Sequence, residues 1–195
     1  MLPTGLSPLP GTEALTMRTK RLGLVPITRE HAPAMFEVLK DPALYEYLSG
    51  SPPVDVAALT RQYEFWEGRT SPDGSELWLN WAIRLDARQQ LIGHLQAGVL
   101  PDRADMAWIL GARWQQHGYA TEAANAVVDV LLGLGLREIR ASINPNHAAS
   151  IRVAERLGMR RTNEVFDGEL IWKRVYSLPA APNVKRDNSL SHSNN

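Results

Sequence analysis

The spacing of apolar residues divides the first third of the chain into three elements. Between Thr19 and Ile27 apolar side chains recur at every second position, which is typical of a half-buried strand. In residues 29–40 and 55–69 they recur at helical spacing instead, directly after the candidate N-cap residues Thr28 and Asp55. The pattern therefore predicts one strand followed by two helices.

From residue 76 the period of the apolar pattern returns to two. The pattern predicts three successive strands, at residues 76–85, 91–100 and 106–112. The polar segments between them, 86–90 and 101–105, are typical of turns. Strands joined by turns this short are expected to pair with antiparallel neighbours. The middle of the chain is therefore predicted to form an antiparallel meander.

Helices and strands alternate in the last third. An alanine-rich helix is predicted after the loop at 114–121, and it ends at a Gly-Leu-Gly sequence in which glycine suits a left-handed C-cap. The following elements are a strand at 136–143, a helix at 146–158 and a hairpin over 159–178. Because the 136–143 strand follows a helical crossover, we expect it to run parallel to its neighbour. The predicted class is α/β (α+β), a mixed central sheet of about seven strands with about four helices on its faces.

The composition favours one soluble domain with two short extensions. The 195 residues are 44% hydrophobic and 22% charged, which is ordinary for a globular protein. Residues 17–178 are expected to fold, residues 1–16 to form a flexible extension, and residues 179–195, rich in Asn and Ser, to be disordered. Met17 is a second candidate start. The proline-broken N-terminus does not resemble a signal peptide, so a cytoplasmic protein is expected.

Charge and residue usage disfavour several classes of function. The formal net charge of +0 provides no general attraction to nucleic acid or to anionic membranes. No apolar run reaches the roughly 20 residues that a membrane span requires. The chain has no cysteine, which excludes a thiolate nucleophile and thiolate zinc ligands, and no metal is expected. Catalysis must therefore rely on other groups.

The loop at 114–121 is the first candidate binding site. Backbone N–H groups at the start of a helix lack intrahelical partners, and Gly118 lets the chain turn so that several of them converge. The helix dipole favours a phosphate there. An ordinary loop before a buried helix remains the simpler alternative. The sequence contains neither a P-loop nor a dinucleotide-binding glycine pattern at this position.

Polar residues on the two adjacent predicted helices extend this candidate site. Glu122, Asn125 and Asp129 form one polar stripe that is expected to face solvent. Asn146 and Ser150 stand four residues apart, so on a helix they share a face and can hydrogen-bond one extended ligand. A helix cap for Asn146 and a surface position for Ser150 are the alternatives.

Together these segments resemble the GNAT superfamily of acyl-CoA-dependent N-acetyltransferases, in particular its ribosomal-protein (Rim-type) branch. The segment "TKRLGLVPI" is similar to the family's T-x-R-L start, and "ADMAWILGARWQQHGYATEA" is similar to its bulged strand and pyrophosphate loop. "INPNHAASIRVAERLGM" resembles its N-x-x-S helix, with Met159 in place of an aromatic residue. The loop pattern R/Q-x-x-G-x-G/A is matched by residues 115–120. The resemblance covers nearly all of residues 17–177.

The resemblance implies a GNAT fold that uses acetyl-CoA as cosubstrate. Backbone amides from about Gln116 to Ala120 would hold the pyrophosphate, and Ile109, Leu110 and Asn146 would contact the pantetheine arm. The cofactor-binding set implied for the loop is Gln115, Gln116, His117, Gly118, Tyr119, Ala120 and Thr121. Arg152 and Arg156 are expected on the helix surface, with contact to the 3′-phosphate of CoA as the alternative.

The resemblance also implies direct transfer of the acetyl group to an amine, without a nucleophilic residue. Ser150 would donate a hydrogen bond to the leaving thiolate, and a main-chain N–H in 108–110 would bind the oxyanion. Asp105 is the first candidate base, with a turn carboxylate as its alternative. His94 is the second, with a half-exposed strand histidine as its alternative.

The acceptor is left open by the sequence. Family members place the acceptor beside the segment that here contains Tyr45, Tyr47 and Leu48. A protein N-terminal α-amine needs only a weak base, because its pKa of about 7.7–8.0 is far below the value of about 10.4 for lysine. A small amine such as an antibiotic or a polyamine is the close rival. A non-catalytic acyl-CoA-binding module is the competing class, and a homodimer is one option for the assembly.

Overall fold

The computed structural model describes residues 15–177, and they form one mixed sheet with helices on both faces. The strands are β1 (Met17–Arg18), β2 (Leu22–Pro26), β3 (Leu77–Leu85), β4 (Gln90–Val99), β5 (Arg103–Leu110), β6 (Glu138–Ile143), β7 (Arg160–Phe166) and β8 (Glu169–Val175). The main helices are α1 (Ala32–Leu39), α2 (Val56–Glu67), α3 (Tyr119–Gly133) and α4 (Ala148–Arg156). The predicted α/β class and element order are confirmed.

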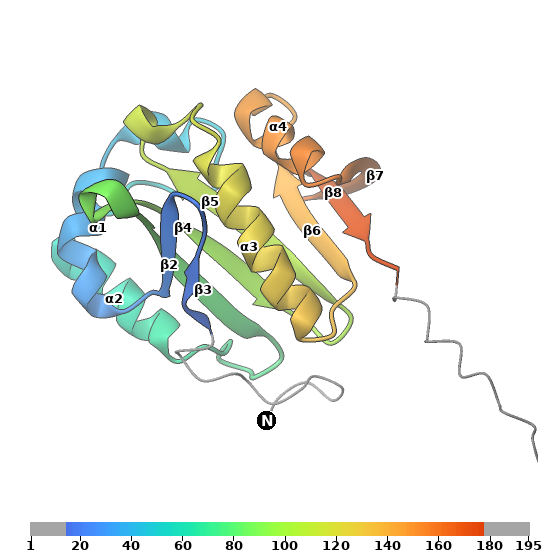
Figure 1. Cartoon of the computed structure of the whole chain (residues 1–195), viewed down its shortest axis with the longest axis horizontal. Coiled ribbons are helices and arrows are strands. Elements are labelled where there is room, and N and C mark those ends of the chain that lie inside the picture. The colour runs from blue at the N-terminus through green and yellow to red at the C-terminus, as the bar shows by residue number, and fades with distance from the viewer. Residues whose placement is uncertain (1–14, 178–195) are drawn as a thin grey trace, which may run out of the picture.

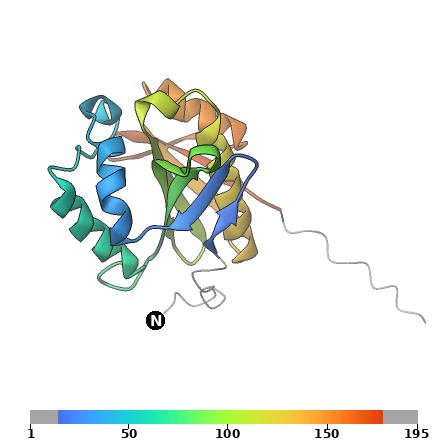
Figure 2. The same cartoon turned by 60° about the vertical axis from the view of Figure 1, so that its left-hand side comes forward.

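The sheet has the order β1-β2-β3-β4-β5-β6-β8-β7. The meander β3–β4–β5 is antiparallel, as the alternating pattern predicts. β6 pairs parallel to β5, as expected for a strand that follows a helical crossover. Figure 2 shows α1 and α2 on one side of the sheet and α3 on the other. The core lies between these layers and includes Leu24, Trp81, Val127 and Ile139, all fully buried.

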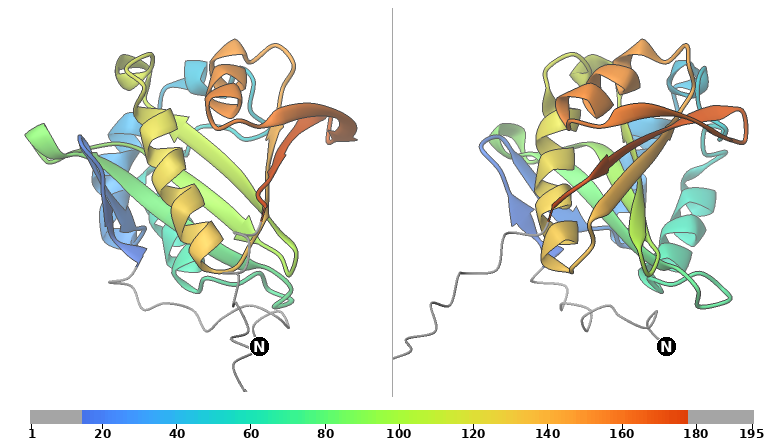
Figure 3. Two further views of the ribbon diagram at one scale, coloured as in Figure 1. Left: turned by 45° about the vertical axis from the view of Figure 1, so that its right-hand side comes forward. Right: turned by 90° about the vertical axis from the view of Figure 1, so that its right-hand side faces the viewer.

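The pairing of β5 with β6 covers only the first part of each strand. It joins Arg103 with Glu138, Ala104 with Ile139 and Asp105 with Arg140, and no later residue of β5 pairs with β6. Figures 1 and 3 show the two strands close at one end and apart at the end that faces α4 and the loop before α3. One edge of β5 beyond Asp105 therefore has no strand partner, and its main-chain groups face the gap.

Two helix starts follow the predicted capping residues. The Asp55 carboxylate accepts a hydrogen bond from the Ala58 N–H at 2.6 Å, as an N-cap of α2 should. Thr28 instead precedes a short 3₁₀ turn, Arg29–His31, so that α1 begins three residues later than expected. The left-handed glycine predicted after α3 is Gly135, with φ of +95°.

The strand predicted at 106–112 begins earlier, at Arg103. Its turn is tighter than the five residues expected, because the Leu100 N–H donates to the Arg103 carbonyl at 2.9 Å. Asp105 consequently lies inside β5 and not before it. The bulge expected in this strand is absent from the described pairing of β5 with β4; the register shift occurs between β3 and β4, near Ile83.

The folded body includes Leu15, which lies within the predicted extension of residues 1–16. Leu15 is 2% exposed, and its carbonyl accepts a hydrogen bond from the indole N–H of the buried Trp81 at 2.8 Å. Residues 1–14 of that extension, and the tail predicted at 179–195, lie outside the described residues. Over the described range, no helix has the length and apolarity needed to cross a membrane.

Candidate active site

The gap between β5 and β6 opens into a cleft of about 640 Å³. Its walls come from the segment between α1 and α2, the end of β5, the loop before α3 and the start of α4. All the predicted cofactor-binding residues except His117 line it: Ile109, Leu110, Gln115, Gln116, Gly118, Tyr119, Ala120, Thr121 and Asn146. The fold therefore brings together segments that lie as far apart in the sequence as Ala43 and Arg156.

The loop before α3 has the backbone geometry of an anion site. Gln116 and Gly118 both adopt the left-handed conformation, with φ of +63° and +78°. Gln115 fixes the start of the loop, because its side-chain amide donates to the Leu110 carbonyl at 3.0 Å. Within the described residues, nothing accepts a hydrogen bond from the backbone N–H groups of residues 116–121. These groups and the N-terminus of α3 together favour a bound phosphate.

Thr121 adds a side-chain donor to this array. Its hydroxyl is buried and, in the described structure, has no hydrogen-bond partner, although Thr121 lines the cleft. A buried hydroxyl without a partner costs free energy, so a polar ligand group that bonded to it would stabilise the complex.

The start of α4 differs from the sequence-based expectation. The helix begins at Ala148 with His147 as its N-cap residue, so Asn146 precedes the helix. Asn146 and Ser150 nevertheless both line the cleft, and Ser150 is buried. The N-x-x-S pattern places its first residue three positions before the serine. That position is occupied by His147, which the sequence analysis overlooked because Asn146 is its immediate neighbour.

His147 contacts the opposite wall of the cleft. Its ring lies 5.3 Å from the ring of Tyr47, measured between centroids. Burial lowers the pKa of His147, and the nearby Glu46 carboxylate only partly opposes this effect. The imidazole is therefore neutral at neutral pH. The Tyr47–His147 contact joins the segment between α1 and α2 to the start of α4 across the gap.

A second, smaller cavity of about 40 Å³ continues from the cleft. The two share the residues Tyr47, Leu48, Trp108, His147 and Ser150. The small cavity is also lined by Ala107, which neighbours Trp108 in β5, so the two side chains point to opposite faces of the sheet. The small cavity is also lined by residues 141–143 of β6, so it lies between β5 and β6, and the shared residues form its junction with the cleft.

Glu169 is the carboxylate at this junction, and the sequence analysis did not single it out. It begins β8 and lines the small cavity together with Ser150. Burial raises the pKa of Glu169, and the nearby Asp167 raises it further. A carboxylate with a raised pKa is a stronger base. No local signal marks Glu169, because it sits beside an ordinary Asp-Gly turn and reaches the site only through the pairing of β8 with β6.

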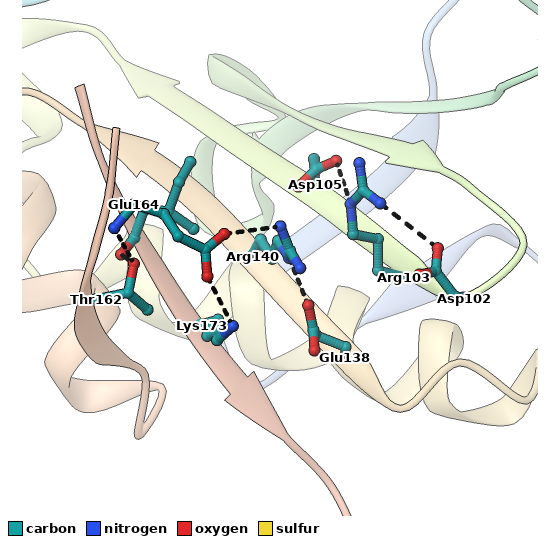
Figure 4. A network of polar contacts seen from close by, with 9 residues as sticks. Asp102, Arg103, Asp105, Glu138, Arg140, Thr162, Glu164 and Lys173 are labelled. Carbon is teal, nitrogen blue, oxygen red and sulfur yellow. Dashed lines mark hydrogen bonds and ion pairs between the residues drawn. The ribbon is translucent and has the colours of Figure 1, made fainter. Parts of the chain in front are cut away.

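Neither candidate base from the sequence analysis lines the cleft or the small cavity. Asp105 bonds to the Arg103 guanidinium at 3.3 Å, in the group of charged residues on and beside β5, β6, β7 and β8 that Figure 4 shows. His94 is buried beneath Trp66, with ring centroids 5.6 Å apart, and burial lowers its pKa to about 4. The alternative considered for His94, a half-exposed strand histidine, is therefore wrong, since His94 is 8% exposed.

The remaining predicted contacts divide between the cleft and its surroundings. Tyr47 and Leu48 line the cleft, whereas Tyr45 does not. His117 is not a lining residue either; its ring stacks on Tyr119 with centroids 5.5 Å apart. Arg152 and Arg156, expected on the helix surface, are exposed and also line the cleft. They supply positive charge at its α4 side.

The fold is a mixed sheet with a cleft that suits a phosphate-bearing ligand, and the comparisons identify its family. The model of the acetyltransferase (GNAT) domain matches residues 21–160. The chain belongs to this family. It is 30% identical over 148 residues to YkkB of Bacillus subtilis (strain 168), covering 70% of this chain and 80% of that protein.

Solved structures of known acetyltransferases share the fold at low sequence identity. RimL, the ribosomal L7/L12 α-N-protein acetyltransferase, solved with coenzyme A, matches with a TM-score of 0.69 at 18% identity, over 83% of this chain and 98% of that one. AAC(6')-Ib, solved with ribostamycin and coenzyme A, matches with a TM-score of 0.67 at 16% identity, over 80% and 94%. These two neighbours act on different acceptors, so the fold alone does not select between a protein and a small molecule.

Proposed function

We propose that this GNAT acyltransferase transfers an acetyl group from acetyl-CoA directly to a primary amine, and that the acceptor is the α-amino group of a polypeptide, as in the Rim-type branch. The observation that carries the proposal is the continuous path from the N–H groups of residues 116–121 to the junction at Ser150. One end of this path suits a diphosphate. The other end adjoins the small cavity between β5 and β6, which would admit a second substrate.

Successive parts of the cleft would suit the diphosphate, the pantetheine arm and the thioester of acetyl-CoA. The N–H groups of 116–121 and the Thr121 hydroxyl would hold the diphosphate, and Arg152 and Arg156 lie where they can meet the 3′-phosphate. The unpartnered edge of β5 at Ile109 and Leu110 would pair with the amides of the pantetheine arm, with Asn146 and His147 on the other side. The thioester supplies the acetyl group when bound, and its place is the junction.

The chain's own groups at the junction match the needs of aminolysis. Glu169 would accept a proton from the ammonium form of the acceptor, directly or through a water, so that the neutral amine can attack the thioester. A main-chain N–H of Trp108 to Leu110 would stabilise the oxyanion. Ser150 would donate a hydrogen bond to the departing thiolate, which resembles the cysteine thiolate with its pKa of about 8.5 and so needs only modest help. No covalent intermediate with the protein is required.

The small cavity supports an acceptor that presents a single amine. Of the residues that line it, Glu169 is the sole carboxylate, and most of the others are aromatic, aliphatic or neutral polar side chains. A polyamine or an aminoglycoside carries several ammonium groups, which would need several carboxylates for charge compensation. An α-amine is also partly neutral near pH 8, so one carboxylate with a raised pKa suffices as its base.

An acceptor screen with detection of free thiol tests the proposal. Peptides with free N-termini should release CoA thiol faster than polyamines or aminoglycosides do. Glu169→Gln should lower kcat by about a hundredfold or more, in the range typical of general acid–base catalysis, while Asp105→Asn serves as the matched carboxylate control. Binding of CoA without turnover on any amine would refute the catalytic proposal, and selective turnover of polyamines would refute the acceptor class.

The role of Ser150 has its own test. Ser150→Ala should lower kcat with little change in the KM for acetyl-CoA, because the hydrogen bond to the thiolate develops only as the C–S bond breaks. An unchanged maximal rate under conditions where chemistry limits turnover would remove Ser150 from the mechanism.

A further inference from the structure

The T-x-R-L segment of the first strands contacts the helix that follows the anion loop. The Thr19 hydroxyl donates to Glu122 Oε1 at 2.5 Å, and the Arg21 backbone N–H donates to the same oxygen at 2.9 Å. The Arg21 guanidinium bonds to Glu122 Oε2 through Nε and Nη2, each at 2.6 Å. Glu122 thus receives four donors from a segment that lies about a hundred residues earlier in the sequence.

Arg21 also holds the loop itself on both sides of Gly118. Its Nη1 donates to the His117 carbonyl at 3.0 Å. Its guanidinium carbon lies 4.5 Å from the centroid of the Tyr119 ring, which also stacks on the ring of His117. A single side chain therefore contacts the residue before Gly118, the residue after it and the first turn of α3.

The loop needs such a constraint because its backbone is strained. Gln116 holds a left-handed φ that non-glycine residues rarely adopt. Loop residues in sparsely populated conformations persist only where the surroundings fix them. The Gln115 side chain secures one end of the loop through Leu110. Arg21 secures the other end, next to the N–H groups that converge on the cleft.

We propose that Arg21 is a positioning residue for the diphosphate: it holds the N–H groups of residues 116–121 in their anion-binding arrangement by bracing His117 and Tyr119. The proposal rests on the proposed use of acetyl-CoA. Arg21 does not line the cleft, so it acts through the loop and not by contact with the phosphates. It also gives a function to the T-x-R-L segment, which the catalytic proposal leaves unused.

The charge of Arg21 provides a competing explanation that can be separated. Glu122 lies in the first turn of α3, where a carboxylate repels a nearby diphosphate. Arg21 neutralises Glu122, so the loss of Arg21 both loosens the loop and exposes this negative charge. When both side-chain charges are removed, the only remaining effect is the loss of the contacts of Arg21 with His117 and Tyr119. The double variant therefore distinguishes positioning from charge compensation.

The experiment compares two acetyl donors that differ in the diphosphate. The full-length chain and the variants Arg21→Gln, Arg21→Lys and Arg21→Gln/Glu122→Gln are assayed with acetyl-CoA and with S-acetylpantetheine, which lacks a diphosphate. Arg18→Gln is the matched control, because Arg18 lies in the same hairpin, is 74% exposed and is 3.7 Å from Asp86. Circular dichroism and the Tm establish that each variant is folded.

The proposal predicts a split between KM and kcat. Arg21→Gln and the double variant should raise the KM for acetyl-CoA about tenfold, the equivalent of about 1.4 kcal/mol of binding, with kcat unchanged. Arg21→Lys should raise it by a smaller factor, since lysine keeps the charge but lacks the planar fork. The kcat/KM for S-acetylpantetheine should be unchanged in every variant, and Arg18→Gln should match the parent chain with both donors.

Three results would overturn the proposal. A double variant with the parent KM would show that Arg21 only neutralises Glu122. An equal loss of kcat/KM with both acetyl donors would show that Arg21 has a general structural role. Unchanged kinetics in Arg21→Gln would show that Arg21 has no role in the reaction. If Arg21→Gln does not fold, Arg21→Lys gives the same readout. Calorimetric titration of the parent chain with CoA separates this test from the proposed function: if the parent does not bind CoA, it is the proposed function that fails.

Discussion

A chain that begins at Met17 should be markedly less stable than the full chain. Such a chain lacks Leu15, which is 2% exposed and accepts the indole hydrogen bond of the fully buried Trp81 at 2.8 Å. Removal of a buried leucine side chain loses about 1.5–3 kcal/mol of hydrophobic stabilisation. A buried indole N–H left without a partner costs about 1–3 kcal/mol more. The expected loss of about 2.5–6 kcal/mol is a large part of the 5–15 kcal/mol typical of a domain.

Urea unfolding followed by tryptophan fluorescence measures this loss. The full chain, the chain beginning at Met17 and the full-length variant Leu15→Ala are compared under identical conditions, with Val54→Ala as control because Val54 is 88% exposed. Leu15→Ala should lose only the side-chain part of the free energy, since its carbonyl remains. Neutral surface substitutions change the free energy of unfolding by about 0.5 kcal/mol or less. If the free energy of unfolding of the chain beginning at Met17 lies within that range of the full chain, then Leu15 does not contribute to the core.

Three further predictions concern the loop and the buried polar groups. Gly118→Ala should weaken CoA binding by about 1–2 kcal/mol through backbone strain, because φ at residue 118 is +78°. A steric clash is not the cause, since the nearest atom to an added Cβ is 3.6 Å away. Calorimetric titration measures the affinity for CoA, and an unchanged affinity would contradict the strain. Tyr63→Phe should stabilise the fold by about 1 kcal/mol or more, because the buried Tyr63 hydroxyl has no partner in the described structure; a lower Tm would argue against this. His94 has a folded pKa of about 4, below its ordinary 6.5, because it is buried. Its neutral form is therefore favoured by folding, and stability should fall as pH decreases from about 6.5 towards 4. His94→Leu should flatten this part of the profile, and an identical profile would refute the assignment.

The sequence by itself determined the element order and the anion loop, because both are encoded locally. The alternation in residues 76–100 and the Asp55 cap are visible within a few positions, and so is the glycine that turns the chain at 118. The loop pattern of residues 115–120 was recognisable for the same reason: a phosphate-binding arrangement of backbone N–H groups depends on a short run of dihedral angles.

Errors of one to three residues at element boundaries were enough to displace candidate residues. Asp105 was expected before its strand, but the tight turn at residues 101–102 places it inside β5, on the charged face. The match to the N-x-x-S pattern was attached to Asn146, whereas the position three residues before Ser150 is that of His147, the N-cap residue of α4. Side-chain direction in a strand reverses with each residue, so such small shifts decide which group reaches the cleft.

Only the tertiary structure decided which distant residues meet. Glu122 was expected to face solvent as part of a polar stripe, yet it is held by Thr19 and Arg21 from the first strands. Glu169 reaches the junction because β8 lies next to β6, an order that the hairpin sequence does not specify. The reason is physical: periodicity records whether a residue is buried or exposed on its own element, whereas the partner it meets depends on strand order and register. The sequence therefore predicted the loop that we propose for the cofactor, and the fold brought together the groups that we propose to act beside it.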